Sequence, residues 1–337
     1  MQNLRIGRSG LKASRLALGA MGFGDPAWRS WVLPEDATRP IIARALEHGI
    51  NFFDTCDFYS LGKSEEVLGR VLNELVPREE VVIATKVGGP LGKGPNGRGY
   101  SRKRIMAAVD GSLRRLGLDY IDLYQTHIWD PATNLEEMMR AFDDLIRSGK
   151  VLYVGAADMP VWQFVKANHI ADQNGYSRFI SMQNHYNLIF REDEREQIPY
   201  CLAEGIALLP YSPMARGMLC DASRYDDGGR TERARTDDYA LKWYHRQSDR
   251  DMVGRVGAIA TEIGAKPAQV ALAWVLDRPG VTAPVFGATD PSHVDDAVAA
   301  LDLTLDDEHF AALDAAYEPR AINDVSTSAH RAAKAVP

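Results

Sequence analysis

Short apolar runs alternate along most of the chain with longer stretches that have the periodicity of amphipathic helices. The runs are rich in Val, Ile, Leu and Phe, which is typical of parallel strands covered on both faces. They cover residues 16–19, 51–53, 81–86, 121–125, 151–156, 179–183, 206–209 and 282–286. The main helical stretches cover residues 38–48, 65–72, 104–116, 135–147, 161–169, 194–203 and 267–276. This alternation predicts right-handed βαβ units and a parallel sheet.

The number of units decides between two parallel-sheet folds. Strand starts are separated by roughly thirty to forty residues as far as residue 206, after which the gap nearly doubles. Eight such units close into a (β/α)8 barrel, whereas five or six form an open doubly wound sheet. No strand is followed at once by the G-x-G-x-x-G turn of dinucleotide-binding doubly wound folds. The sequence therefore predicts an α/β protein with one (β/α)8 TIM barrel domain over residues 1–337.

The extra length after the seventh strand predicts a long loop over residues 212–249, which is polar and rich in Arg. Loops of this length in compact domains are usually functional or disordered. A second flexible loop is expected at residues 88–99. The last ~10 residues of the chain are expected to be disordered, because they are small and polar and lie at a terminus.

Composition narrows the class of protein. The chain has 337 residues, of which 45% are hydrophobic and 25% are charged, as in soluble globular proteins. A net charge of -7 argues against a nucleic-acid partner, and no apolar run approaches the ~20 residues that span a membrane. The N-terminal segment lacks the apolar stretch of a signal peptide, so we expect a cytoplasmic protein. Cys56, Cys201 and Cys220 lack a metal-type spacing, so we expect no metal site, and their odd number suits a reducing compartment.

Catalytic groups of a barrel lie at the carboxyl ends of its strands. The polar residues at those ends include Asp54, Asp57, Tyr59, Lys86, His127, Gln183, Asn184 and His185. Each alone has a structural explanation, as a cap, a solvated side chain or a packed ring. Together they indicate chemistry, because Lys86 ends an apolar strand and needs a charged partner, which Asp54 can provide. This pair would lower the pKa of the Tyr59 phenol and suit it to protonate a carbonyl oxygen, with His127 as a second donor.

Several longer motifs carry a resemblance to a known family. In chain order they are GINFFDTCDFYSLGKSEEVLG, VVIATKVG, LRRLGLDYIDLYQTH, SGKVLYVGAAD, MQNHYNLIFREDERE, LLPYSPMARGML and VFGATDPSHVDDAV. Through these motifs nearly the whole chain resembles the aldo-keto reductases, in particular the bacterial and fungal branch related to the potassium-channel β-subunits. The family fold is the (β/α)8 barrel, which agrees with the strand count.

The resemblance implies a catalytic tetrad of Asp54, Tyr59, Lys86 and His127. Tyr59 would be the general acid, Lys86 and Asp54 would tune it, and His127 would orient the carbonyl. The resemblance also implies NADP(H) at the carboxyl-terminal mouth of the barrel, covered by the long loop. The implied cofactor-binding residues are Asp158, Gln183, Tyr211, Ser212, Met214, Gly217, Leu219, Arg235, Gly287, Thr289, His293 and Asp296.

Among these residues, Gln183 would bond the carboxamide and Tyr211 would stack on the nicotinamide ring. Ser212, Met214, Gly217 and Leu219 would lie along the pyrophosphate, and the residues from Gly287 to Asp296 would lie near the adenosine. The basic stretch with Arg230, Arg233 and Arg235 either covers the cofactor or is a solvated charge cluster.

Two departures from the family pattern bear on the cofactor. After the fifth strand, the usual Ser and its polar neighbour are replaced by Ala157 and Asp158. Near the adenosine, His293 stands where Lys, Arg or Gln is common, and Asp290 adds a negative charge. We therefore expect only a modest preference for NADPH over NADH.

The leading interpretation is an NADP(H)-dependent oxidoreductase that reduces an aldehyde or ketone to an alcohol, or runs the reverse reaction. The alternatives are a barrel aldolase that forms a Schiff base on Lys86 and a cofactor-sensing regulatory subunit with slow turnover. The expected partner is a small-molecule carbonyl compound or alcohol, and the oligomeric state stays open.

Aromatic residues expected near the mouth of the barrel favour a bulky or apolar substrate, unless about half of them pack beneath loops. They are Phe23, Trp28, Trp31, Phe58 and Trp129.

Overall fold

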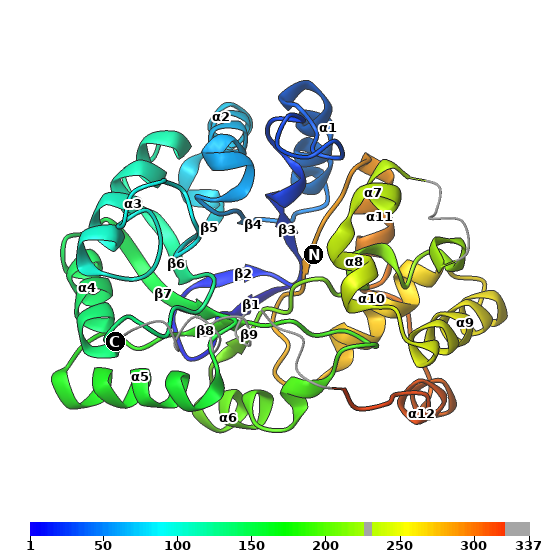
Figure 1. The fold of residues 1–337 in the computed structure, drawn as a ribbon. Helices are drawn as coiled ribbons and strands as arrows, with labels where there is room; N and C mark the ends of the chain where they lie inside the picture. Colours follow the sequence, from blue (N-terminus) through cyan, green and yellow to red (C-terminus); the bar gives the residue numbers. More distant parts are fainter. Residues whose placement is uncertain (226–230, 321–337) are drawn as a thin grey trace.

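A computed structural model of the chain describes residues 1–225 and 231–320. Its centre is an eight-stranded parallel sheet with the strand order β10-β3-β4-β5-β6-β7-β8-β9 (Figure 1). The strands are β3 (Ala17–Gly19), β4 (Phe52–Asp54), β5 (Val82–Val87), β6 (Ile121–Thr126), β7 (Val151–Ala157), β8 (Ser181–Gln183), β9 (Ala207–Leu208) and β10 (Val285–Phe286). Backbone N–H groups of Thr282 and Val285 donate to the carbonyl oxygens of Leu208 and Pro210, both at 2.8 Å. These bonds join the two ends of the sheet, so the predicted barrel is confirmed.

Helices follow the strands along the chain and form a ring outside them (Figure 1). They are α1 (Glu35–Glu47), α2 (Lys63–Leu75), α3 (Arg102–Leu116), α4 (Leu135–Arg147), α5 (Val161–Asn174), α6 (Gln197–Glu204), α10 (Pro267–Asp277) and α11 (Pro291–Ala299), and α12 (Asp307–Ala315) lies beyond them in the chain. Each turns an apolar face inward, as α4 does with Met138, Phe142 and Leu145. Gly117 ends α3 with a φ of 67°, a left-handed conformation that glycine adopts at little cost.

The hydrophobic core has two layers, one between the sheet and the helices and one inside the barrel. An antiparallel hairpin, β1 (Asn3–Arg5) and β2 (Lys12–Ser14), closes the amino-terminal end of the inner layer. Ile6 of this hairpin is fully buried with Phe52 and Leu123 of the barrel strands. The hairpin was not predicted from the sequence, because its strands are short and each carries one cationic residue and one apolar residue.

The prediction of one long loop over residues 212–249 is only partly correct. The segment contains η5 (Ala215–Gly217), η6 (Ala222–Tyr225), α7 (Glu232–Thr236) and α8 (Asp238–Trp243), and α9 (Gln247–Glu262) begins inside it. Helix α9 buries Met252, Val256 and Ile259 at helical spacing. It was not predicted from the sequence, because its two internal glycines lower its helix propensity. The predicted disorder of the last ten residues and the position of Arg230 lie outside the described residues.

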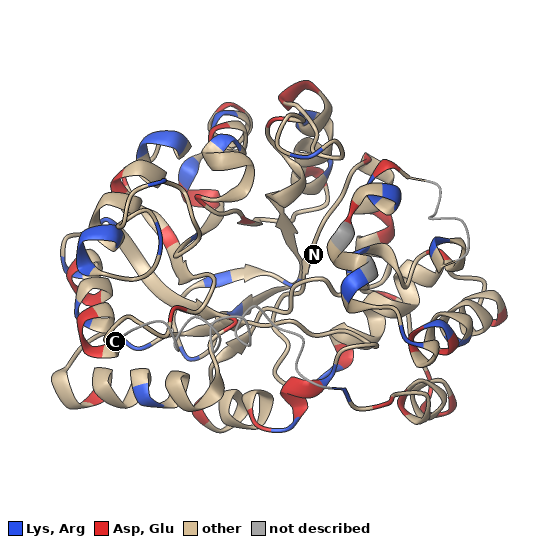
Figure 2. Ribbon diagram, viewed as in Figure 1, with Lys and Arg blue, Asp and Glu red and all other residues tan. Residues whose placement is uncertain are grey.

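Basic and acidic residues are interspersed along the outer helices, as the blue and red parts of the ribbon in Figure 2 show. In the described part of the chain, no helix is both long and apolar enough to cross a membrane. Within the same residues, His, Cys, Asp and Glu side chains nowhere gather in threes as a metal ion would require.

Candidate active site

Lys86 and Asp54 form a buried ion pair at the carboxyl ends of β5 and β4. The Lys86 Nζ atom lies 2.5 Å from Asp54 Oδ1 and donates to the carbonyl oxygen of Thr55 at 2.9 Å. The second carboxylate oxygen of Asp54 accepts hydrogen bonds from Gln125 at 3.2 Å and Gln183 at 2.9 Å. Burial acts to lower the pKa of Lys86, but the neighbouring Asp54 and other groups leave that pKa raised. Lys86 therefore stays a charged ammonium group.

Tyr59 lies in the segment after β4, at the start of a tight turn that holds its ring against the ion pair. The turn η2 (Tyr59–Gly62) has positive φ at Ser60 and Leu61, both near 50°. The Lys86 ammonium lies 5.1 Å from the centre of the Tyr59 ring. Burial raises the pKa of Tyr59 and outweighs the opposing effect of Lys86. The predicted lowering of this pKa is therefore wrong for the structure as it stands, and the phenol keeps its proton at neutral pH.

His127 follows β6 and brings a neutral imidazole to the same place. Its ring meets the Tyr59 ring edge to face, with centres 5.5 Å apart and planes at 88°. Burial, assisted by the charge of Lys86, lowers the pKa of His127 to about 3. The Nδ1 atom contacts Cys56 Sγ at 3.1 Å. Within residues 1–225 and 231–320, Nε2 makes no hydrogen bond, so it is the ring nitrogen left for a ligand.

Tyr211 presents a flat ring to the same end of the cavity. It stacks on His185 with ring centres 5.1 Å apart and planes at 11°, and His185 stacks in turn on Phe190 at 4.1 Å. The Tyr211 hydroxyl donates to Asp158 Oδ2 at 3.1 Å. His185 Nε2 lies 2.5 Å from the Tyr244 hydroxyl in the segment after α8. These contacts fix the Tyr211 ring, so it can support a second planar ring on its open face.

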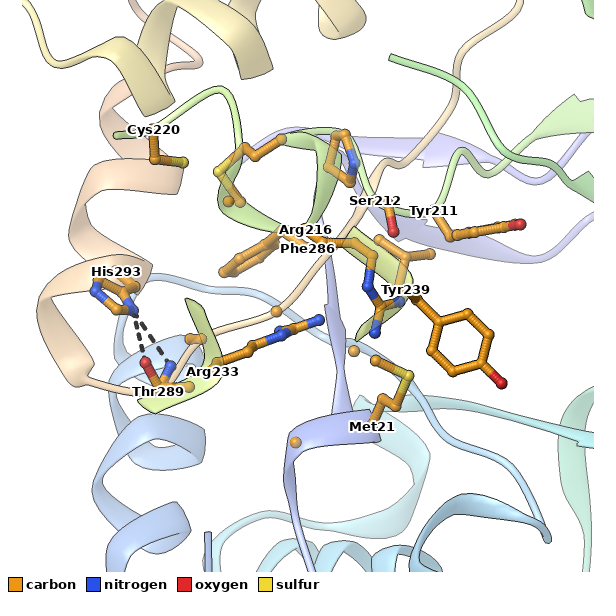
Figure 3. Close-up of a pocket in the computed structure, with 18 of the residues that line it drawn as sticks. Met21, Tyr211, Ser212, Arg216, Cys220, Arg233, Tyr239, Phe286, Thr289 and His293 are labelled. Atoms are coloured by element: carbon orange, nitrogen blue, oxygen red, sulfur yellow. Dashed lines mark hydrogen bonds between the residues drawn. The ribbon is translucent and has the colours of Figure 1, made fainter. Parts of the chain in front are cut away.

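A cavity of about 560 Å³ extends from Tyr59 and His127 to the start of α11. Arg216 and Arg233 extend into it, with Tyr239 nearby (Figure 3). Both arginines pair with Asp237, at 2.7 Å and 3.3 Å. Arg224 also lines the cavity and donates to the carbonyl oxygen of Arg216 at 2.5 Å. Three guanidinium groups thus line this part of the cavity, and Asp237 pairs with two of them. This excess of positive charge suits an anionic ligand.

The far end of the cavity lies between the starts of α10 and α11. The backbone N–H of Thr289 donates to His293 Nδ1 at 3.2 Å (Figure 3). Lys266 lines this end and pairs with Asp296 at 2.7 Å. Asp290 does not line the cavity. Its carboxylate instead caps α11 by accepting a hydrogen bond from the backbone N–H of Ser292 at 2.9 Å. Lys266 was not among the predicted site residues, although it precedes the proline that begins a helix.

Most of the predicted site residues lie around this one cavity. Those that line it are Asp54, Tyr59, His127, Asp158, Gln183, Tyr211, Ser212, Met214, Gly217, Gly287, Thr289, His293 and Asp296. Lys86 is buried directly behind Asp54 and Tyr59. Leu219 is instead fully buried in the core, and Arg235 is exposed beside Glu232, so neither lines the cavity. Arg216, Arg224 and Lys266 were not predicted from the sequence, because arginine and lysine in loops are usually solvated.

Fewer of the predicted aromatic residues line the cavity than was expected. Trp28 and Phe58 line the cavity. Phe23, Trp31 and Trp129 are at most 4% exposed and pack beneath loops. The alternative that about half of these aromatic residues are structural is therefore confirmed.

Comparison with known proteins agrees with this geometry. The model of the aldo/keto reductase family matches residues 15–318. The chain is 42% identical to the versiconal hemiacetal acetate reductase of Aspergillus parasiticus, over 96% of this chain and 99% of that protein. It is 37% identical to the aldo-keto reductase AMT2 of Alternaria alternata, over 93% of this chain and 91% of that protein. It is 36% identical to the aldo-keto reductase dtxS3 of Metarhizium robertsii, over 95% and 92% of the two chains.

Proposed function

Because the chain belongs to the aldo/keto reductase family, we propose that it is an NADP(H)-dependent reductase of aldehydes or ketones in which Tyr59 donates the proton. The observation that carries this proposal is the meeting of a protonated phenol and a neutral imidazole at one end of the cavity. The reverse reaction, oxidation of an alcohol, would use the same residues.

Reduction of a carbonyl group adds hydride to carbon and a proton to oxygen. A bound nicotinamide cofactor supplies the hydride. Tyr59 holds its proton until the substrate oxygen takes it, and the phenolate then formed lies beside the Lys86 ammonium. This nearby positive charge stabilises the phenolate most when negative charge develops on it, which is when it assists the reaction. Asp54 keeps Lys86 in place and charged.

His127 would hold the substrate oxygen in position for this transfer. Its imidazole is neutral above about pH 4, because burial lowers its pKa to about 3. A neutral imidazole carries one proton, and contact of Nδ1 with Cys56 leaves Nε2 to donate to the carbonyl oxygen. His127 thus serves as a hydrogen-bond donor and not as a second acid.

The cavity residues fit a dinucleotide. Tyr211 would support the nicotinamide ring, with Asp158 and Gln183 beside its carboxamide. The guanidinium groups of Arg216, Arg224 and Arg233 would face the pyrophosphate, along with Ser212, Met214 and Gly217. Lys266, Thr289 and His293 would face the adenosine end, where Lys266 offers the cation that favours the extra phosphate of NADPH.

The geometry does not favour the aldolase alternative. A Schiff-base lysine must be neutral and must reach the substrate. Lys86 has a raised pKa, is fully buried and is paired with Asp54, and it does not line the cavity.

The direct test follows the hydride into the product. The protein would be incubated with NADPH deuterated at C4 and a panel of aldehydes, diketones, sugars and polycyclic ketones, with NADH in parallel. We expect consumption of NADPH to match alcohol formation, with deuterium on the carbinol carbon. Binding of NADPH without turnover of any carbonyl would instead favour the sensing role. A Lys86 adduct trapped by borohydride would favour the aldolase.

A further inference from the structure

Arg29 lies in the loop between η1 (Ala20–Gly22) and α1 and lines the catalytic cavity. Its guanidinium carbon lies 4.6 Å from the centre of the Trp28 ring and 5.6 Å from that of Trp31. The centre of the Tyr239 ring of α8 lies 5.3 Å from the same atom. Three aromatic rings thus hold the planar guanidinium group in place without using its N–H donors.

Among the residues that the structure describes, no carboxylate pairs with the Arg29 guanidinium. Arg216 and Arg233 share Asp237, and Lys266 pairs with Asp296. Within residues 1–225 and 231–320, Arg29 has neither an ion pair nor a hydrogen-bond acceptor. A guanidinium group presents five N–H donors in a fixed plane that matches a carboxylate. The cavity wall therefore carries an ordered guanidinium group whose N–H donors are available to bind an anion.

An aromatic wall connects Arg29 to the proposed proton donor. Trp28 packs edge to face against Phe58, with ring centres 5.9 Å apart and planes at 89°. Phe58 precedes Tyr59 in the chain, and both line the cavity. Tyr239 and Met21 also extend into the cavity, as does Tyr211 (Figure 3). A flat substrate with its carbonyl at Tyr59 would lie along aromatic rings, and its far end would approach Arg29.

We propose that Arg29 binds an anionic group of the substrate, so that the preferred substrate is an aromatic aldehyde or ketone with a carboxylate remote from the carbonyl. This inference rests on the proposed carbonyl reduction. A phosphate of the cofactor is the other anion that could meet Arg29, and the test separates the two.

The kinetic test compares two aldehydes that differ only in charge, para-carboxybenzaldehyde and its methyl ester. The measured quantity is the ratio of kcat/KM for the acid to kcat/KM for the ester. We expect this ratio to exceed one for the wild-type protein and to fall about tenfold to hundredfold in Arg29→Gln, the effect of losing one charge-assisted contact. Arg29→Lys should give an intermediate ratio, because it keeps the charge but loses the planar fork. Arg140→Gln is the matched control, since Arg140 is exposed on α4 and does not line the cavity.

A binding test makes the result independent of turnover. Tryptophan fluorescence would give the Kd of benzoate and of benzamide, and separately the Kd of NADPH, for each variant. We expect Arg29→Gln to weaken benzoate binding about tenfold or more while benzamide and NADPH bind as before. Loss of NADPH affinity with an unchanged acid-to-ester ratio would overturn the proposal and assign Arg29 to the cofactor. An unchanged benzoate Kd would also overturn it. If benzoate binding depends on Arg29 but neither aldehyde is reduced, the proposed reductase activity fails and the anion site stands.

Discussion

Tyr59, Lys86 and His127 meet at the carboxyl ends of neighbouring strands, where burial and neighbouring charges together set the pKa of each. Burial keeps the phenol protonated and the imidazole neutral, whereas Asp54 keeps the lysine charged. Residue types at strand ends were sufficient to predict this group from the sequence. The direction of the Tyr59 pKa shift was not predictable, because it depends on how deeply the surrounding chain buries the ring.

Removing Lys86 should affect stability as well as catalysis. In Lys86→Met, the Asp54 carboxylate stays buried without its counter-ion. Breaking a buried pair from one side typically costs about 3–5 kcal/mol of unfolding free energy, which urea unfolding would measure. Adding Asp54→Asn to this variant should restore part of the loss, because no buried charge is then left unpaired. A single variant as stable as the wild type would show that the pair contributes little.

The neutral state of His127 makes a prediction about pH. A histidine with a pKa of about 3 does not titrate between about pH 5 and pH 8, so it should add no step to the reduction rate in that range. Asp57, whose pKa burial raises to about 6, can add a step of its own. The profile of the wild type should therefore have the same shape as that of His127→Asn, although the variant is slower. A step near pH 6.5 that disappears in His127→Asn would contradict the neutral assignment.

At the scale of elements, the segment between β9 and α10 supplies most of the basic residues of the cavity. It brings Arg216, Arg224 and Arg233 into the cavity through short helices. Its Arg-rich composition left two interpretations open, a segment that covers the cofactor or a solvated charge cluster, and could not show which arginines face inward. Arg233 lines the cavity and Arg235 does not, because neighbouring positions on a short helix such as α7 point in different directions.

Lys266, just before α10, should contribute to the choice between NADPH and NADH. Replacing it with Met removes the cation at the far end of the cavity, while its backbone N–H still donates to Gln269 at 2.8 Å. We expect the Kd of NADPH to rise about tenfold, as for one charge-assisted contact, and the Kd of NADH to change less. Fluorescence titration with both cofactors measures this difference. An equal change in both constants would mean that Lys266 does not face the extra phosphate.

At the scale of the whole molecule, a closed barrel holds these strand ends in one ring. The count of apolar runs predicted the barrel, because each run had to be buried between helices and the barrel interior. The hairpin at the opposite end escaped prediction, since strands of three residues with exposed positions have too short a pattern. The geometry of that end is tight, as Gly7 shows. It has a φ of 59°, and a Cβ atom there would lie 2.7 Å from the carbonyl oxygen of Ile180.

Gly7→Ala should therefore destabilise the barrel without changing its chemistry. The added methyl group meets backbone oxygen atoms and forces a left-handed conformation on alanine. We expect a loss of about 1–3 kcal/mol in the free energy of unfolding. Gly94→Ala is the matched control, because nothing lies within 4 Å of a Cβ atom at Gly94. Equal stabilities of the two variants in urea would show that the hairpin does not close the barrel as described.

The central claim is that Tyr59 donates the proton in carbonyl reduction, and Tyr59→Phe tests it most directly. This change removes one hydroxyl group and leaves the ring against Lys86 and His127. The measurement is kcat for reduction together with the Kd of NADPH. The matched control is Tyr120→Phe, since Tyr120 packs against Arg78 outside the cavity. Loss of the general acid should lower kcat at least ~10²-fold and leave the Kd of NADPH nearly unchanged. A Tyr59→Phe protein that turns over as fast as Tyr120→Phe would remove Tyr59 from the mechanism.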